Sequence, residues 1–206
     1  MTTGVDAVRT AVLAHALHGR PVTIPSLAAA TGMPRGEVAA ALAALDETGA
    51  VYLRDGTIIA AYPFSLVPTA HRIAIGEAMV YANCAVDALA IPPMADEPAQ
   101  IVSACGHCGA AVTVTMHGGR VLGSRPATPV VFYVERDCCA VGPAVLTRCP
   151  HIQFFCDRDH AARWQASHPE LRGTVFDLAS AAAFSSEHFS KAIRAVRESA
   201  DRSLPR

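Results

Sequence analysis

A chain of 206 residues fits one large domain, or a small domain followed by a medium-sized one. Hydrophobic residues make up 51% of it and charged residues 17%, so a core is easily buried, and the net charge of −1 gives no long-range attraction for nucleic acid. No apolar run approaches the roughly 18 residues of a membrane span, and no targeting signal is recognisable at the start, so we expect a soluble, cytoplasmic protein. Seven cysteines without an export signal favour thiols or metal ligands over a disulfide framework.

The first part of the chain, residues 1–66, predicts a small helical unit. Apolar residues at helical spacing predict helices over 5–18, 25–31 and 34–48, and the Asp55-Gly56 turn predicts a hairpin between strands 50–53 and 57–62. Three helices followed by a hairpin are typical of a winged helix-turn-helix.

The third of these helices is a poor candidate for reading DNA. Its exposed face offers Arg35 but also Glu37, Asp46 and Glu47. A reading helix is expected to bring several cationic or amide side chains to the groove and its phosphates, which carboxylates repel. We therefore interpret residues 1–66 as a winged-helix-like module that packs against the rest of the protein and does not bind nucleic acid.

The remaining residues, 67–206, differ in composition from the first part of the chain and contain all seven cysteines. Alternating or β-branched runs predict strands over 69–75, 79–81, 99–104, 111–116, 130–134 and 152–155, and helical patterns cover 84–91, 157–168 and 179–199. Strands mixed with helices in no strict βαβ order imply an α+β fold, with a mixed α/β second domain of mainly antiparallel strands.

Cys84 and Asp87 are the first candidates for chemistry. If their segment is helical, the two side chains share a face and can reach one ligand. A carboxylate beside a thiol can take its proton and return it, provided that burial raises the pKa of the carboxyl group. On spacing alone, however, a structural cysteine beside an ordinary acid is the favoured interpretation, and the same holds for Cys149 ahead of its apolar segment.

A family resemblance changes this balance. From about Pro68 onward the chain resembles the organomercurial lyases (alkylmercury lyases): Tyr81-Ala-Asn83-Cys84-Ala-Val-Asp87-Ala-Leu89 is similar to the family segment Tyr-Ala-aromatic-Cys-Ala-x-Asp-x-Leu. The segment 149–155 is similar to the one that carries the second catalytic cysteine. The family also has a winged-helix-like N-terminal module, so the resemblance spans nearly the whole chain.

The resemblance implies a catalytic set of Cys84, Asp87 and Cys149. Two departures from the family pattern stand beside this set. Asn83 replaces an aromatic residue, which predicts a more polar pocket, and Pro150 replaces a frequent second cysteine.

The implied reaction is cleavage of the carbon–mercury bond by protonolysis, giving a hydrocarbon and Hg(II). Mercury(II) is a soft cation that prefers thiolates, so Cys84 and Cys149 are expected to hold it as the bound product while Asp87 protonates the departing carbon. No redox cofactor is required for a protonolysis. External thiols, or a partner mercuric reductase, would then remove the metal.

Cys105-Gly-His-Cys108 has the spacing of a metal knuckle or a thiol–disulfide pair. A zinc site would need two more ligands, from Cys138-Cys139, His151, Cys156 or His160. Cys138 and Cys139 are not expected on one metal, because neighbours in a strand face opposite sides. Structural thiols, a metal pair and a redox pair all stay open for Cys105 and Cys108.

Two other function classes compete with the lyase. A metal-responsive winged-helix regulator would combine the N-terminal module with a cysteine-rich sensor, but the acidic third helix and Asp87, which a sensor does not require, argue against it. A non-catalytic relative that carries a soft metal is poorly separated from the lyase by sequence.

Overall fold

The structure, a computed structural model, describes residues 3–95 and 97–203 and begins with three helices, α1 (Gly4–Leu17), α2 (Ile24–Thr31) and α3 (Arg35–Glu47). Thr3 and Thr23 cap the first two helices, each accepting a hydrogen bond from the third helical N–H. The apolar stripes of the three helices pack together, with Val12 and Val38 fully buried. The helices predicted for this region are confirmed.

The hairpin that follows consists of β1 (Val51–Arg54) and β2 (Thr57–Ala61), paired antiparallel. Asp55 and Gly56 both have positive φ, 51° and 75°, as a tight two-residue turn requires. The hairpin is not isolated, because β2 pairs with β3 (Phe64–Ser65), which pairs with β5. The division at residue 66 stays a prediction. The predicted unit 1–66 begins, and the predicted unit 67–206 ends, outside the described residues.

The large sheet has eight strands in the order β1-β2-β3-β5-β4-β6-β7-β8. Its further strands are β4 (His71–Ile75), β5 (Ala78–Ala82), β6 (Pro98–Ala104), β7 (Ala111–His117) and β8 (Arg120–Arg125). Every described pair is antiparallel. Along β7 the side chains of Val112, Val114 and Met116 alternate into the core, which is the period of two that the sequence shows. The predicted α+β class with antiparallel strands is confirmed.

A smaller sheet places β9 (Val130–Val134) between β10 (Gln153–Phe155) and β11 (Gly173–Asp177). Helix α6 (Arg158–Ala166) covers it, with the Trp164 ring 5.3 Å from Phe132 and 5.5 Å from Phe155 between centroids. Strands β8 and β11 and the short helix α5 (Ala144–Thr147) were not expected. Their residues are largely exposed or half-buried, so they lack the apolar alternation that marks a strand or a helix in sequence.

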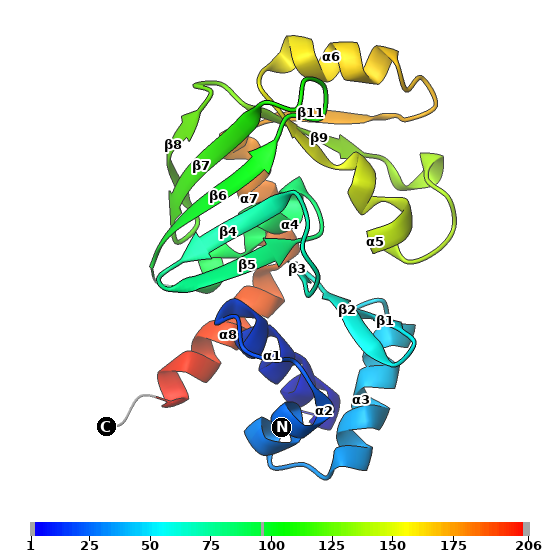
Figure 1. The fold of residues 1–206 in the computed structure, drawn as a ribbon, viewed down its shortest axis with the longest axis vertical. Coiled ribbons are helices and arrows are strands. Elements are labelled where there is room, and N and C mark those ends of the chain that lie inside the picture. Colours follow the sequence, from blue (N-terminus) through cyan, green and yellow to red (C-terminus); the bar gives the residue numbers. More distant parts are fainter. Residues whose placement is uncertain (1–2, 96, 204–206) are drawn as a thin grey trace.

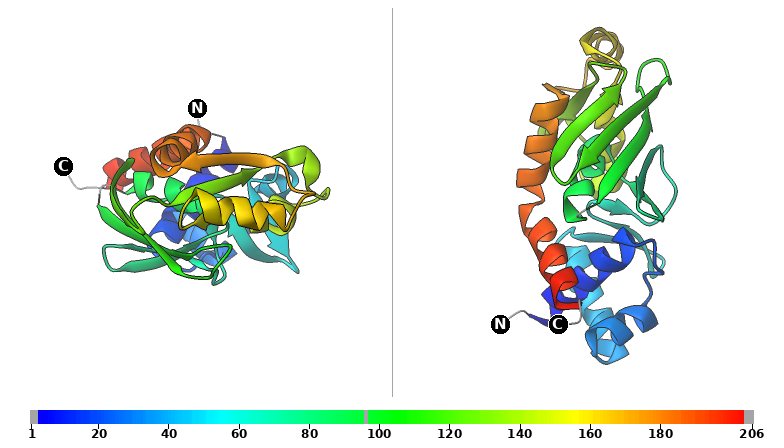
Figure 2. Two further views of the ribbon diagram at one scale, coloured as in Figure 1. Left: turned by 90° about the horizontal axis from the view of Figure 1, so that it is seen from above. Right: turned by 90° about the vertical axis from the view of Figure 1, so that its left-hand side faces the viewer.

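The last helical region, predicted as one stretch over 179–199, is two helices, α7 (Leu178–His188) and α8 (Ser190–Ser203), with Phe189 between them. Figures 1 and 2 show them along one side of the molecule, α7 behind the sheets and α8 beside α1. No helix in the described ranges is long and apolar enough to cross a membrane.

Helix α7 fixes the short helix α4 (Ala85–Ala90), which the sequence predicted over 84–91. The hydroxyl of Ser185, fully buried, donates a 2.6 Å hydrogen bond to the carbonyl of Val86. Val86 lies between the two candidate residues Cys84 and Asp87. The bond therefore attaches their segment to the C-terminal helices.

Replacing Ser185 with alanine should lower the free energy of unfolding by about 1–2 kcal/mol, because it leaves the buried Val86 carbonyl without its partner. Ser186→Ala is the matched control in the same helix, since no hydrogen bond of its hydroxyl is found, and it should change stability by less than about 0.5 kcal/mol. Urea unfolding of both variants measures the difference. Equal effects of the two substitutions would contradict this role of Ser185.

Candidate active site

The start of α4 brings Cys84 and Asp87 together. Cys84 is the N-cap, in an extended conformation (φ −154°, ψ 177°), and its Sγ accepts a hydrogen bond from the N–H of Asp87 at 3.4 Å. A cap oxygen of serine or aspartate usually takes this place. The two groups thus meet by capping geometry, rather than by sharing one face of a helix that includes both, as the sequence suggested.

Cys149 reaches the same place from a distant segment. It opens a 3-10 turn (Cys149–His151) immediately before β10, and the N–H of Ala85 donates to the carbonyl of Ile152 at 3.0 Å. Its Sγ lies 4.0 Å from Oδ2 of Asp87. The ligand atoms of Cys84, Asp87 and Cys149 all lie within 4.8 Å of one another, and all three residues are buried. We call this set the thiol–carboxyl cluster.

Burial controls the protonation of this cluster. Removal from water raises the pKa of Asp87 to about 7, although hydrogen bonds from Cys84 and Asn83 and the charge of Arg148 act to lower it. Burial also raises the pKa of Cys84 well above its ordinary value, with Cys149 and Asp87 adding to the effect. Near neutral pH the carboxyl group therefore exists both as an acid and as a carboxylate.

The thiol–carboxyl cluster lines a pocket of about 700 Å³. Its lining also includes residues from the beginning and the end of the chain, namely Arg9, residues 48–50 and residues 187–192. The pocket is large enough for a small organic ligand.

Tyr62 and Arg148 also line this pocket, and neither was predicted as a site residue. The Tyr62 oxygen accepts a 2.6 Å hydrogen bond from the N–H of Val145, which ties the hairpin to the segment ahead of Cys149. The Arg148 guanidinium lies 4.6 Å from the centre of the Tyr133 ring and donates to the carbonyl of Val134. Arg148 adjoins Cys149 in the sequence, and this was the one feature that could have indicated Arg148 as a site residue. No feature of the sequence indicated Tyr62.

Asn83 does not line the pocket, contrary to the expectation that it makes the pocket more polar. Its Nδ2 donates to the carbonyls of Phe64 (3.2 Å) and Pro63 (3.4 Å). Asn83 therefore anchors the backbone ahead of Cys84 and influences Asp87, not the pocket wall.

A second cluster joins Cys105 and Cys108 to Cys156 and His160. The four ligand atoms lie within 4.8 Å of one another, which selects Cys156 and His160 from the ligands that the sequence left open. Burial acts to raise the pKa of Cys105, but hydrogen bonds from the backbone of Cys108 and from His160, among others, outweigh it and lower this pKa to about 6. We call this set the four-ligand cluster.

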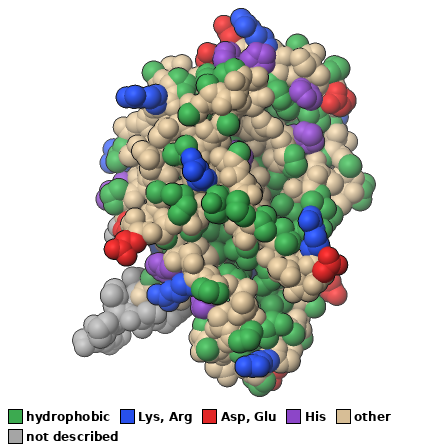
Figure 3. Space-filling model, viewed as in Figure 1, with side chains coloured by type: hydrophobic (Ala, Val, Ile, Leu, Met, Phe, Trp, Pro, Cys, Tyr) green, Lys and Arg blue, Asp and Glu red, His purple; other side chains and the backbone are tan. Residues whose placement is uncertain are grey.

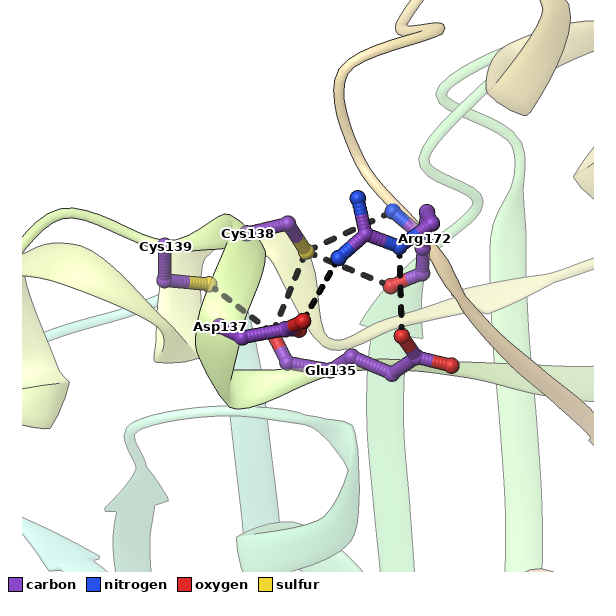
Figure 4. Close-up of polar contacts among 5 residues, drawn as sticks. All are labelled: Glu135, Asp137, Cys138, Cys139 and Arg172. Carbon is purple, nitrogen blue, oxygen red and sulfur yellow. Dashed lines mark hydrogen bonds and ion pairs between the residues drawn. The ribbon is translucent and has the colours of Figure 1, made fainter.

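Cys138 and Cys139 belong to neither cluster. They lie at the end of a 3-10 turn (Arg136–Cys138), and both sulfurs donate to the carbonyl of Glu135, at 3.2 and 3.4 Å (Figure 4). The expectation that they do not share one metal stays a prediction, but its reason does not hold, because the two residues lie at a 3-10 turn and not in a strand. Cys138 also bonds to the backbone of Arg172, whose side chain pairs with Asp137 at 2.6 Å.

Fold and site together define an α+β protein with two buried thiols and a buried carboxyl group at one pocket, a site suited to a soft metal. Comparison with known proteins identifies the class. The family model for alkylmercury lyase matches residues 64–190. The alkylmercury lyase of Staphylococcus epidermidis is 34% identical over 74% of this chain and 68% of its own, and that of Streptomyces lividans is 33% identical over 79% and 73%.

A solved structure agrees with these relatives. The crystal structure of the mercury-bound form of MerB2 superposes with a TM-score of 0.77 at 26% identity, covering 92% of this chain and 90% of that one. The chain therefore belongs to the alkylmercury lyase family, which confirms the resemblance and the enzyme class predicted from its sequence.

The raised pKa of Asp87 predicts a pH-dependent stability difference between the wild type and Asp87→Asn. Folding favours the protonated carboxyl group, so its stabilising effect is complete below the ordinary pKa of 3.8 and is lost as the pH rises through about 7. Asparagine stays uncharged. Between pH 3.8 and about pH 7 the free energy of unfolding of the wild type should therefore fall, relative to that of Asp87→Asn, by at most about 1.4 kcal/mol per pH unit. Above about pH 7 the difference should stay constant.

Urea unfolding of both proteins between pH 4 and pH 8, as a series of matched pairs, measures this difference. A difference that stays constant over the whole range would contradict the raised pKa of Asp87.

Proposed function

We propose that this protein cleaves the carbon–mercury bond of organomercurials by protonolysis, with Cys84, Asp87 and Cys149 as its catalytic residues. The supporting observation is the thiol–carboxyl cluster, in which two thiols and one carboxyl group share a single pocket. Membership of the alkylmercury lyase family supports the same reaction.

The first step is capture of R–Hg(II) by one thiolate. Since burial keeps the Cys84 thiol protonated, the incoming soft cation must replace a proton. The ligand that mercury brings into the pocket, a small thiolate, leaves with the first thiol proton. Asp87 takes the second proton, from Cys149, whose sulfur faces its Oδ2.

The second step breaks the carbon–mercury bond. The Cys149 thiolate adds to the mercury that Cys84 already holds, electron density moves towards the carbon, and Asp87 delivers its stored proton there. One carbon–mercury bond and one O–H bond break while one C–H bond and one sulfur–mercury bond form, so no electrons enter or leave. The products are the hydrocarbon and Hg(II) held by Cys84 and Cys149.

This balance requires no redox cofactor. An external thiol, or a mercuric reductase as partner, accepts Hg(II) from the two thiolates by ligand exchange. A carboxyl group whose pKa lies near 7 suits the cycle, because it can accept and return a proton at neutral pH with little driving force lost in either direction.

Asp87 also separates this proposal from a non-catalytic carrier of soft metals. A carrier needs the two thiols and gains nothing from a buried carboxyl group, which costs free energy to ionise. The same residue argues against a metal sensor.

The N-terminal helices and hairpin, in our proposal, form a winged-helix-like module that packs and does not read DNA. Asp46 supports this role, because its Oδ1 accepts a 2.9 Å hydrogen bond from the N–H of Leu53 and so ties the third helix to the hairpin. On the face in Figure 3 the Lys and Arg side chains stand apart from one another instead of forming a basic stripe. Tight, salt-sensitive binding to a specific promoter fragment would contradict it. The cytoplasmic location stays a prediction.

The proposed function predicts that the purified protein releases benzene from phenylmercury in the presence of excess thiol, at about one benzene per mercury complexed. Cys84→Ser, Cys149→Ser and Asp87→Asn should each lower the rate by about 100-fold or more, since each removes a group that bonds to mercury or transfers the proton. Cys139→Ser is the control, because its thiol lies outside both clusters and should leave the rate near that of the wild type.

Asp87→Asn separates capture from cleavage. It retains both thiols, so it should still bind phenylmercury, seen by mass spectrometry as a stable adduct, while it releases benzene about 100-fold more slowly than the wild type or slower still. Absence of benzene from the wild type would refute the lyase proposal, and a wild-type rate in Cys84→Ser would refute the site.

A further inference from the structure

The turn that carries Cys105 and Cys108 is shaped and held by backbone contacts. Gly109 has φ +73°, and its N–H bonds to the carbonyl of Cys105 at 2.9 Å, which closes the turn. The N–H of Gly106 donates to the carbonyl of Phe154 in β10 at 2.9 Å. A side chain at Gly106 would meet the Phe155 ring at 3.0 Å, so glycine is needed for this close approach. The turn therefore lies directly against β10.

The other two members of the four-ligand cluster come from the end of β10 and the start of α6. Cys156 follows β10, and His160 lies in the first turn of α6, where Asp157 caps the helix by accepting a 2.8 Å hydrogen bond from the N–H of His160. The ring of His107 packs edge-on against the His160 ring, with 5.1 Å between centroids. Backbone and ring contacts thus hold His160 towards the three sulfurs.

The distances fit a tetrahedral metal ion. For bonds of roughly 2.3 Å to sulfur and roughly 2.0 Å to nitrogen, the ligand atoms of a tetrahedral zinc site stand about 3.5–3.8 Å apart. Cys105 Sγ is 3.4 Å from His160 Nδ1, Cys108 Sγ is 3.9 Å from Cys156 Sγ, and no pair exceeds 4.8 Å. A disulfide between Cys108 and Cys156 would need a separation of about 2.05 Å.

We propose that Cys105, Cys108, Cys156 and His160 bind one structural Zn(II) ion. Three thiolates and one imidazole are a donor set that zinc takes in closed structural sites, whereas calcium and magnesium require oxygen ligands. Four protein ligands complete the tetrahedron and leave no position for a substrate. The thiol–carboxyl cluster differs from this site in two ways: it has three protein groups instead of four, and it lines a pocket that a substrate can enter.

The zinc ion would connect three segments that the sequence keeps apart: the turn between β6 and β7, the end of β10 and the start of α6. Cys149 lies at the other end of the segment that runs through β10 to Cys156. The metal thereby anchors the strand that carries one catalytic thiol, while it stays outside the reaction.

Metal analysis of the purified protein tests this site without reference to lyase activity. Wild type produced in zinc-supplemented medium should contain about one zinc per chain, and Co(II) in its place should show the strong visible absorption of a tetrahedral thiolate site. The double variant Cys84→Ser/Cys149→Ser should keep this zinc. Cys108→Ser and Cys156→Ser should lose most of it, while Cys139→Ser should keep it as the matched thiol control.

Removal of zinc by a chelator should also lower the melting temperature of the wild type and leave that of Cys108→Ser nearly unchanged. Cys108 is exposed, so its substitution by serine should leave the fold intact. A wild type that contains no zinc, or zinc that persists in Cys108→Ser and disappears from the Cys84→Ser/Cys149→Ser double variant, would overturn the proposal. Failure of the lyase proposal would leave this result unaffected.

Discussion

The burial of one carboxyl group beside two thiols is the constraint on which the rest of the structure depends. Asp87 is only 3% exposed, and a carboxylate in such a place is costly unless charges or hydrogen bonds compensate it. Here the compensation is partial. Burial raises the pKa of Asp87, whereas hydrogen bonds from Cys84 and Asn83 and the charge of Arg148 lower it. The resulting pKa is about 7. A carboxyl group without these partners would stay protonated, and one in water would stay ionised, so neither could both take and return a proton.

The fold assembles this environment from distant segments. Helix α4 supplies Cys84 and Asp87, and the segment ahead of β10 supplies Cys149 and Arg148. The bond from Ser185 holds α4 against α7, and the bond between Ala85 and Ile152 holds it against the other segment. The N-terminal helices, in the lower part of Figure 1, supply part of the pocket wall together with residues 187–192. The beginning of the chain therefore contributes to the site.

Strongly periodic elements could be predicted from the sequence, and weakly buried ones could not. Helices α1 to α3 and strands such as β7 carry apolar residues at the period of their structure. Strand β8 faces solvent over most of its length. The break between α7 and α8 at Phe189 falls in a helical run whose alanine and serine residues do not indicate where one helix ends. In both cases pairing and packing with distant residues decide the outcome.

The site shows the same division. The spacing of Cys84 and Asp87 indicated a pair, but Cys149 follows Asp87 by 62 residues, so only the family resemblance connected it to them. For Cys105 and Cys108 the sequence offered several partners, and the packing of β10 against the turn decided for Cys156 and His160. Cys138 and Cys139 were assumed to lie in a strand, but they lie at a 3-10 turn, which can aim adjacent side chains at one carbonyl group.

The most direct test of the proposed reaction is the titration of Asp87 itself. Infrared difference spectra between the wild type and Asp87→Asn isolate the C=O stretch of the protonated carboxyl group as the pH is raised. We predict that this band persists through pH 6 and disappears with a midpoint at about pH 7. A midpoint near the ordinary aspartate value of 3.8 would show that the carboxyl group is ionised throughout the neutral range, and the proposed proton store would not exist.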